Sequence, residues 1–343
     1  MERKSHSAGT LSLGLLTLGL FSIGTAIVGA VPKGSVSAAT SKHDFESCSK
    51  VIVHGQYEEV VTILEKHPEL CRARHPKANE TLLHWIAVYG DDRRVESDAE
   101  AMVISKLIEC GADVDAYNGL GQTPLMEVAR NYKWRMATQL LDAGANPAAQ
   151  KRSFPERPES DCNNVSVMDI AAARGFAKLV TRLLEMGVPI EYPESIPKPG
   201  YPPRRRSALH WCCQGQYNYH QDVRRKEQLE TIDLLCARIS DVNLTELRGE
   251  TPLLVAAASS SAAIVEHLLA RYPKVNVHAV DDDGNSALHL AVVDGRGEDG
   301  ARIVRVLLKH GADPQLRNIA EETPLDIARR RKEQLLIDAL SGK

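Results

Sequence analysis

Aromatic residues are scarce in this sequence, at 5% of 343 positions, and neither sign of charge is in excess. Lysine and arginine total 42 against 45 aspartates and glutamates, a net charge of −3. Without a basic excess, neither nucleic acid nor an anionic membrane surface is expected as the main partner. Seven cysteines are too few for a disulfide scaffold. The composition, with 43% hydrophobic and 25% charged residues, fits a folded protein.

Motifs that carry chemistry are also missing. The sequence has no glycine-rich phosphate loop, no Gly-x-Ser-x-Gly elbow and no His-Glu-x-x-His. The one metal-like cluster is His210, Cys212, Cys213 and His220, and adjacent helical residues point about 100° apart, so the two cysteines cannot easily face one ion. We therefore expect no enzyme, no cofactor, no metal and no small-molecule substrate.

The N-terminus carries the longest apolar run. Residues 11–31 are uncharged, and 13 of these 21 are Ala, Val, Ile, Leu or Phe. A short basic start precedes them, and small residues around positions 36–39 follow, as at a signal-peptidase site. We interpret residues 1–38 as a secretory signal peptide, followed by a linker at 39–42. The alternative is an uncleaved anchor, because 21 residues at ~1.5 Å each reach ~30 Å, enough to cross a bilayer.

A short phrase recurs seven times after residue 42, at spacings of 35 to 44 residues. It starts with Thr or Ser and has Leu or Met at its third position, and a second phrase, typified by Gly-Ala-Asp, closes many of the units. Between the two lies an apolar segment, usually with a Leu-Leu pair. The openers start at Thr81, Thr123, Ser166, Ser207, Thr251, Ser286 and Thr323, and the closing phrases at Gly111, Gly144, Gly187 and Gly311.

Each part of the repeat has a mechanical reason. The opening Thr or Ser accepts a backbone N–H and caps a helix, and proline suits the first turn, where its missing N–H costs nothing. Small residues then let the first helix lie close to its neighbours. The Leu-Leu pair supplies the buried stripe of a second helix, and the closing glycine allows the positive φ that ends it.

These phrases resemble the ankyrin repeat family over residues 43–340. The resemblance implies an all-α repeat solenoid of about eight helix–turn–helix units, joined by β-hairpin-like loops and ended by degenerate caps at residues 43–72 and 324–340. Each unit would bury its apolar face only against its neighbours. The resemblance further implies non-covalent binding of another protein on the concave face and the hairpin tips.

The repeat period exceeds the ~33 residues typical of the family, so every unit carries extra chain. We expect two insertions between paired helices, at 91–100 and 216–227, and two in hairpins, at 151–163 and 191–206. Long loops on a rigid scaffold often carry function. The segment 191–206 holds five prolines and ends in three arginines. It is either part of a partner-binding region or a proline-stiffened spacer.

Three histidines look like a ligand set until their register is noticed. His84, His210 and His289 all occupy the same opener position. In ankyrin-like repeats this histidine typically bonds to backbone between units, and we expect that role here.

The cysteines and tryptophans allow alternatives. In an oxidising compartment a disulfide could join the paired helices of a unit, as Cys48–Cys71 or Cys213–Cys236. Trp85 and Trp211 follow an opener histidine, where packing between units is expected. Trp134 falls in the turn before a second helix and is the better candidate for a partner contact.

The candidate partner-binding residues lie at the variable ends of first helices, on hairpin tips and in the long loops. Tyr and Arg predominate among them, and these are the side chains most useful at protein interfaces. The set is Tyr89, Tyr117, Asn118, Arg130, Asn131, Trp134, Arg174, Tyr192, Tyr201, Arg204, Arg205, Arg206, Gln214, Tyr217, Tyr219 and Arg248.

The signal-like start and the repeats together resemble bacterial exported ankyrin-repeat proteins. We therefore expect a periplasmic or secreted protein, or one anchored to the inner membrane by residues 11–31. Three uses follow from the resemblance: neutralising a toxin as an immunity-type protein, protecting against oxidative stress, or acting as a secreted host-directed effector. The irregular insertions favour the first use, because they suit one dedicated partner.

Overall fold

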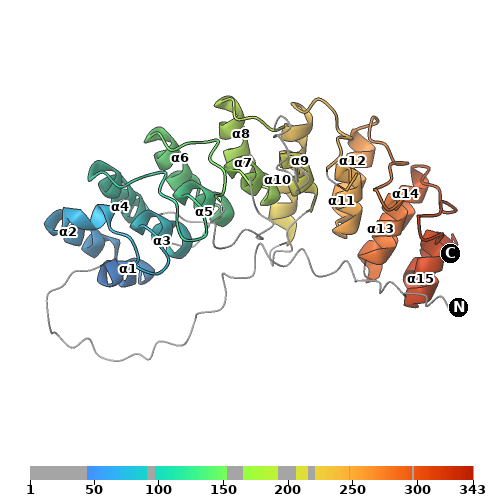
Figure 1. Ribbon diagram of the computed structural model, residues 1–343, viewed down its shortest axis with the longest axis horizontal. Helices are drawn as coiled ribbons and strands as arrows, with labels where there is room; N and C mark the ends of the chain where they lie inside the picture. Colours follow the sequence, from blue (N-terminus) through green and yellow to red (C-terminus); the bar gives the residue numbers. More distant parts are fainter. Residues whose placement is uncertain are drawn as a thin grey trace, which may run out of the picture.

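The protein is an arched stack of helix pairs (Figure 1). The computed structural model describes residues 45–90, 97–152, 165–191, 206–214, 221–246, 248–295 and 297–342. Within these ranges the regular structure is helical, apart from three isolated β-bridges. The expected all-α repeat solenoid is therefore confirmed.

Eight helix pairs follow one another along the described ranges. Their first helices are α1 (Phe45–Val53), α3 (Leu82–Tyr89), α5 (Pro124–Asn131), α7 (Val167–Ala173), α9 (Ala208–Gln214), α11 (Pro252–Ala258), α13 (Ala287–Val293) and α15 (Pro324–Arg331). Their second helices are α2 (Tyr57–Lys66), α4 (Asp98–Glu109), α6 (Trp134–Asp142), α8 (Ala177–Glu185), α10 (Gln221–Cys236), α12 (Ala262–Arg271), α14 (Gly297–Lys309) and α16 (Gln334–Leu340). A short 3₁₀ turn, η3 (Pro68–Arg72), follows α2.

The helices form two layers. First helices pack on the first helices of the next unit, and second helices on second helices. Figure 1 shows α3, α5 and α7 on the inner side of the arch, below α4, α6 and α8. The first helices therefore line the concave side, as the repeat pattern predicts.

The opener residues cap the first helices as expected. The hydroxyl of Ser166 accepts from the backbone N of Asp169 at 3.1 Å, and the Asp169 carboxylate accepts in return from the backbone N of Ser166 at 2.9 Å. The same box recurs at Thr323 and Asp326. Such a cap contributes about 1 kcal/mol to a helix that is only eight residues or so long.

The core is a continuous stripe between the two layers. Leucines of the second helices are fully buried at positions 140, 183, 268 and 307. Small residues of the first helices, such as Ala129, Ala172 and Ala257, are equally buried and permit close approach. Each unit therefore depends on its neighbours for burial, and no unit holds a core of its own.

A ladder of backbone hydrogen bonds joins the hairpin tips. The N–H of Gly119 donates to the carbonyl of Ala78 at 2.6 Å, and Arg152 donates to Gly121 at 2.9 Å. Farther along, Asp282 donates to Arg248 at 2.8 Å and Ile319 to Asp283 at 3.0 Å. Where these tips are described, each unit is thus tied to the next through its hairpin as well as through its helices.

Gly121 is required at its tip, which gives a test of the ladder. Its φ is +73°, and a β-carbon there would collide with the carbonyl oxygen of Arg152. We expect Gly121→Ala to lower the free energy of unfolding by about 3 kcal/mol, from the strained φ and the displaced tip. Gly144 is the matched control: its φ is +88° with open space around it, so Gly144→Ala should cost only about 1 kcal/mol. Equal losses in urea titrations would contradict the ladder.

Two of the expected insertions end earlier than the sequence suggested. Residues 98–100 belong to α4, because Ser97 caps that helix by accepting from the backbone N of Glu100 at 3.0 Å. Residues 221–227 belong to α10, since this polar stretch is rich in good helix formers. Most of the insertion chain, at 91–96, 153–164, 192–205 and 215–220, lies outside the described residues.

The six described cysteines are free thiols, so neither Cys48–Cys71 nor Cys213–Cys236 is bridged. Burial raises the pKa of Cys48 to about 11. Cys71 also has a raised pKa, first because of burial and then because it lies beside Cys110. Within the described ranges, no helix is both long and apolar enough to cross a membrane. The proposed signal peptide or anchor, residues 1–38, and the linker at 39–42 lie outside those ranges.

Candidate functional site

The described residues of the concave side form a surface that we call the inner ledge. It consists of the C-terminal ends of the first helices together with the hairpin tips. The tips lie at residues 75–80, 117–121, 150–152, 246–250, 281–285 and 317–321.

An aromatic cluster forms the N-terminal end of the inner ledge. Trp85 and Tyr89, one turn apart on α3, have ring centroids 4.8 Å apart. The edge of Trp85 meets Phe45 at 6.1 Å, and His75 lies 6.2 Å from Trp85. Tyr89 remains 51% exposed, so it covers the cluster and faces solvent. Trp85 thus packs within the fold as expected, while Tyr89 is available to a partner.

Tyr117 and Arg152 form the next feature. The Arg152 guanidinium lies 3.7 Å from the centroid of the Tyr117 ring, and the Tyr117 hydroxyl donates to the carbonyl of Gln150 at 3.3 Å. The two side chains come from neighbouring tips, so the stacking links the second and third hairpins. Arg152 is exposed and presents its charge to solvent over the ring.

A small pocket lies near the middle of the inner ledge, beside the half-buried Trp211. Its volume is about 20 Å³, and Arg130 and Lys151 contribute to its lining together with the apolar side chains of Ile170 and Ala173. The guanidinium of Arg206 lies 5.5 Å from the centroid of the Trp211 ring. Three cations from separate segments therefore converge around one indole.

Arg206, just before α9, binds both Gln214 at the end of α9 and the acidic groups of the following hairpin tip. Arg206 pairs with the Glu246 carboxylate through two nitrogens, at 2.6 and 3.1 Å, and donates to Gln214 at 2.9 Å. Glu250 lies 3.4 Å away on the same guanidinium. Burial, and then the neighbouring Glu246, raise the pKa of Glu250 to about 7. Arg206 is thus partly used to join units five and six, and it also holds Gln214.

The three opener histidines connect successive units, which confirms their predicted role. The Nε2 of His84 lies 3.0 Å from the carbonyl of Gln122, that of His210 the same distance from Glu250, and that of His289 the same distance from Glu322. Since a carbonyl accepts, each Nε2 carries the proton. Burial lowers the pKa of His84 and of His210 to about 4 and that of His289 in the same direction.

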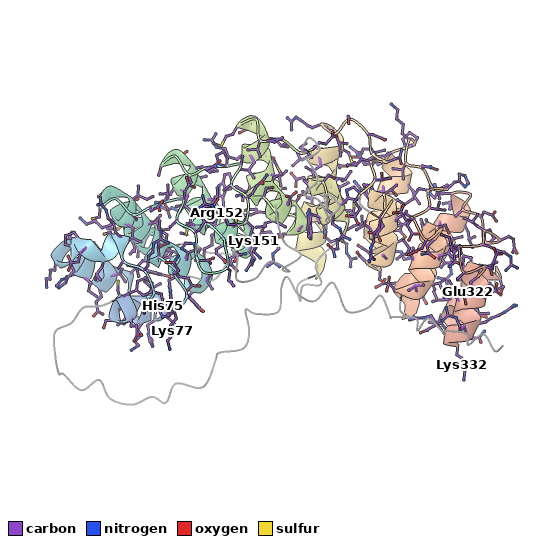
Figure 2. All side chains as sticks on the ribbon, in the orientation of Figure 1. His75, Lys77, Lys151, Arg152, Glu322 and Lys332 are labelled. Atoms are coloured by element: carbon purple, nitrogen blue, oxygen red, sulfur yellow. The ribbon has the colours of Figure 1, made fainter. Side chains whose placement is uncertain are left out.

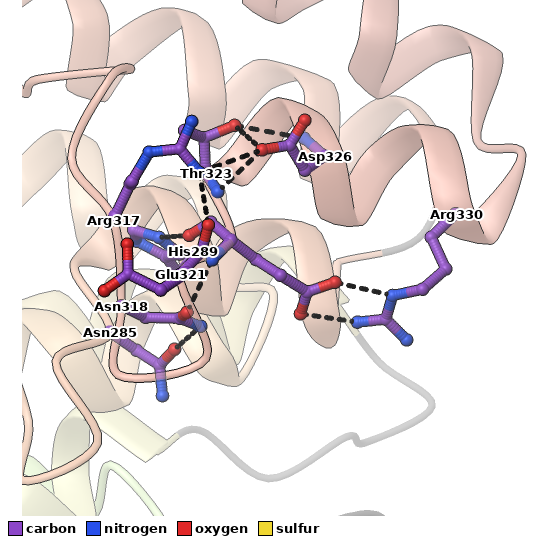
Figure 3. A network of polar contacts seen from close by, with 9 residues as sticks. Asn285, His289, Arg317, Asn318, Glu321, Thr323, Asp326 and Arg330 are labelled. Atoms are coloured by element: carbon purple, nitrogen blue, oxygen red, sulfur yellow. Dashed lines mark hydrogen bonds and ion pairs between the residues drawn. The ribbon is translucent and has the colours of Figure 1, made fainter.

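The last hairpin shows how densely such a connection is bonded (Figure 3). The Asn318 amide donates to Asn285 at 2.9 Å, and its oxygen accepts from the backbone N of Glu322 at 3.1 Å. The Glu322 carboxylate accepts hydrogen bonds from Nε and Nη2 of Arg330, at 2.9 and 3.0 Å. These groups are committed to the fold and do not form a reactive site.

The structure separates the sixteen candidate residues. Asn118 and Asn131 are buried, at 1% and 7% exposure, so we exclude them from the candidate binding surface. Asn118 accepts from the backbone N of Leu120 and Gln122 within its own tip, and Asn131 donates to the carbonyl of Glu127. The physical reason is that a short polar side chain in a tight turn satisfies its own backbone.

Of the other candidates, Tyr89, Tyr117, Arg130, Arg206, Gln214 and Arg248 lie on the inner ledge. Arg174 does too, but its Nε donates to the carbonyl of Arg130 at 2.9 Å. Tyr192, Tyr201, Arg204, Arg205, Tyr217 and Tyr219 lie outside the described residues.

Trp134 lies apart from the inner ledge. It is the first residue of α6 and not a turn residue, and its ring meets Phe176 edge-on at 6.4 Å. It lines an open groove of about 460 Å³ on the second-helix side, between α6, α8 and α10. The groove wall combines the charged side chains of Asp142, Arg182 and Glu185 with apolar surface from Trp134 and Ala177.

Sequence reasoning missed four ledge residues that the structure brings forward: Lys77, Leu120, Lys151 and Arg152. Figure 2 labels Lys77 beside His75 under the first units, and Lys151 with Arg152 toward the middle of the arch. All lie on hairpin tips shortly before an opener or before an insertion. Aligning the tips by the openers would have found Lys77 and Leu120.

A comparison with protein families identifies the C-terminal part of the repeat. Residues 219–318 match the family described as "Ankyrin repeats (3 copies)". The same opener, helix pair and hairpin recur outside this range. Over residues 219–318 the chain therefore matches ankyrin repeats.

Comparison with curated proteins finds mammalian relatives. The chain is 29% identical to human B-cell lymphoma 3 protein, over 81% of this chain and 55% of that protein. It is 24% identical to mouse NF-kappa-B inhibitor delta, over 73% of each chain. The chain thus spans about half the length of the B-cell lymphoma 3 proteins that it matches. These relatives do not support the expected resemblance to bacterial exported proteins.

A solved structure is also similar. It is the ankyrin repeat domain of Bcl-3, described as a unique member of the IkappaB protein family, at 27% identity and a TM-score of 0.47. The match covers 78% of this chain and 100% of that one.

Proposed function

We propose that this chain, because it carries ankyrin repeats, binds another protein on its inner ledge and does not transform it chemically. The observation that carries the proposal is the inner ledge itself. It is a rigid row of tips whose backbone groups are paired, and it leaves Tyr89, Leu120, Arg152 and Arg248 exposed. A preordered surface loses little entropy when a partner binds.

The chemistry of the described side chains supports binding over catalysis. Buried histidines are fixed between an opener hydroxyl and a carbonyl, as at Ser207 and Glu250 around His210. Both ring nitrogens are therefore occupied, and the low pKa leaves a neutral ring with no free position for a substrate. Buried thiols have raised pKa values and are poor nucleophiles.

We further propose that the binding takes place outside the cytoplasm, on the strength of the apolar segment 11–31 and the small residues that follow it. Of the three uses named above, neutralising a toxin in that compartment is the one that the irregular insertions favour. Protection against oxidative stress and a role as a secreted effector are the alternatives. Cell fractionation tests the compartment: a chain shortened by about 38 residues and found outside the cytoplasm supports export, and a full-length cytoplasmic chain contradicts it.

A pair of matched variants tests the binding surface. The ledge variant carries Tyr89→Ser and Leu120→Ser, which remove side chains 51% and 41% exposed. The outer control carries Met102→Ser and Met186→Ser, at 61% and 40% exposure on the second-helix side. In affinity capture with the full chain as bait, the ledge variant should retain at least about fivefold less partner, and the outer control an unchanged amount. Equal losses would place the interface elsewhere.

A further inference from the structure

The two halves of the inner ledge differ in the charge that they present. The first half runs from the tip at 75–80 to the tip at 150–152. There Arg74, Lys77 and Arg152 are exposed, and Lys151 is half-buried. Arg130 joins them at the end of α5. We call this set of five the cationic half. Beyond it, the tip at 281–285 exposes Asp282 and Asp283, which places negative charge on the same surface.

The acidic groups of the first half are withdrawn from this surface. The Glu127 side chain is only 6% exposed and lies 3.5 Å from Arg130. Asp169 is 2% exposed and accepts from Ser166. Burial raises the pKa of Glu80, whose side chain is half-buried. Of the acids near the cationic half, Asp113 is exposed, and it lies 3.5 Å from Arg74. The surface potential over this half is therefore positive although the whole chain is slightly acidic.

The second half carries charges of both signs. Arg330 pairs with both oxygens of Glu322, and Arg317 donates to the carbonyl of Glu321, while Arg248, Arg329, Arg331 and Lys332 are exposed. The acids of the Asp281–Asp283 tip point outward, apart from Asp281, which accepts from Asn285. A uniformly negative ligand that runs along the whole inner ledge therefore meets repulsion at this tip.

We propose that the cationic half binds an acidic, extended segment of a partner protein. This inference rests on the proposed function and specifies its ligand. The described tips of the cationic half, at 75–80, 117–121 and 150–152, pair backbone groups with one another, so recognition there falls to side chains. Glutamate and aspartate side chains of the segment match Lys77, Lys151 and Arg152, while the anionic tip at Asp282–Asp283 stops the segment from extending farther.

The pocket beside Trp211 indicates how strong the contact is. At about 20 Å³ it holds one water molecule but no side chain of a partner. The segment therefore lies over the surface without a deep anchor, and the affinity comes from charge. Such binding is salt-sensitive, since exposed charges are screened over about 8 Å at physiological ionic strength. A long polyanion such as single-stranded nucleic acid fits less well, because it would be repelled at the anionic tip.

The test uses fluorescence anisotropy with the full chain and a labelled peptide of alternating glutamate and serine. Matched peptides carry lysine or glutamine in place of glutamate, and a labelled oligothymidylate is the nucleic-acid probe. The glutamate peptide is expected to bind at least about tenfold tighter than the other three probes, and to lose affinity as salt is added. Absence of binding, or tighter binding of the oligonucleotide or lysine peptide, overturns the proposal.

Charge-reversal variants locate the contact. The variant Lys77→Glu, Lys151→Glu and Arg152→Glu should weaken the glutamate peptide at least about tenfold. The control Arg329→Glu, Arg331→Glu and Lys332→Glu makes the same change of net charge on exposed residues at the C-terminal end and should change affinity by less than about twofold. Equal losses in the two variants mean attraction to net charge alone and overturn the proposal. Circular dichroism checks folding, and the same three ledge positions changed to glutamine should give an intermediate loss.

The outcomes distinguish this inference from the proposed function. If Tyr89→Ser with Leu120→Ser abolishes partner capture while the glutamate peptide fails to bind, the inner ledge still binds a protein but the acidic segment is wrong. If neither the ledge variant nor the outer control captures less partner than the unchanged chain, the proposed function itself has failed.

Discussion

Replacing Glu100 by alanine is expected to lower the free energy of unfolding by about 3–5 kcal/mol, a large effect for a charged residue. Glu100 on α4 and Lys133, which precedes α6, form an ion pair whose two side chains are each 1% exposed. Without the carboxylate, the Lys133 ammonium would be left buried and uncompensated. The pair is also tightly enclosed, because a β-carbon on Gly90 would collide with both charged groups.

Urea titration monitored by circular dichroism measures this loss, and hydrogen exchange in α4 and α6 shows whether it is local. The exposed pair Glu298–Arg305 is the control: its side chains are 70% and 49% exposed, so Glu298→Ala should cost less than about 1 kcal/mol. The double variant Glu100→Leu with Lys133→Met should regain most of the stability, since no charge is then buried. A loss as small as that of Glu298→Ala would contradict the role of the pair.

Acidification from near neutral pH to pH 4 is expected to cost the fold about 6 kcal/mol through its two most strongly shifted buried histidines, before the opposing effect of Glu250. The pKa of His84 and of His210 is lowered from 6.5 to about 4, chiefly by burial. Between these values the unfolded chain binds more protons than the native one, so stability falls as pH falls through 6.5 and levels off below about 4. Each ring contributes about 3 kcal/mol over this window.

Glu250 opposes part of this effect. Its pKa is raised to about 7, so between pH 7 and 4.5 the native state binds the extra proton and gains stability as the pH falls. Because Glu250 is partly exposed, its contribution is screened and smaller than that of the two rings together.

The pH dependence can be assigned by substitution. With His84→Gln and His210→Gln, the fold should be less stable near neutral pH, but its stability should vary far less between pH 6.5 and 4. Changing the exposed His278 to glutamine should leave the original dependence intact. If the double variant keeps the full dependence, the opener histidines are not its source.

Helix pairing could be predicted from the sequence because each signal is local. A capping hydroxyl such as that of Thr323 acts within one unit, and a Thr or Ser stands at the same place in all seven openers. The inter-unit role of His84, His210 and His289 followed from register alone. The limits of α4 and α10 were misjudged because polar segments were taken for loops, although Ser97 caps one helix and helix-forming residues begin the other.

The candidate site was harder to predict because exposure is a tertiary property. Asn118 and Asn131 have the residue type and position of contact residues, yet their side chains bond to nearby backbone. Lys77, Lys151 and Arg152 form a charged surface only because the tips at 75–80 and 150–152 are brought onto one side of the stack. No spacing in one unit shows that Glu127 and Asp169, which could cancel this charge, are buried.

The tip-to-tip ladder also bears on how such a protein can diversify. Because main-chain atoms hold neighbouring hairpins in place, most outward side chains on the tips can be exchanged with little penalty to the stack, glycines such as Gly121 excepted. Specificity is thereby uncoupled from folding. A lineage could drift from one target to another through a few tip substitutions, while the architecture underneath is inherited unaltered.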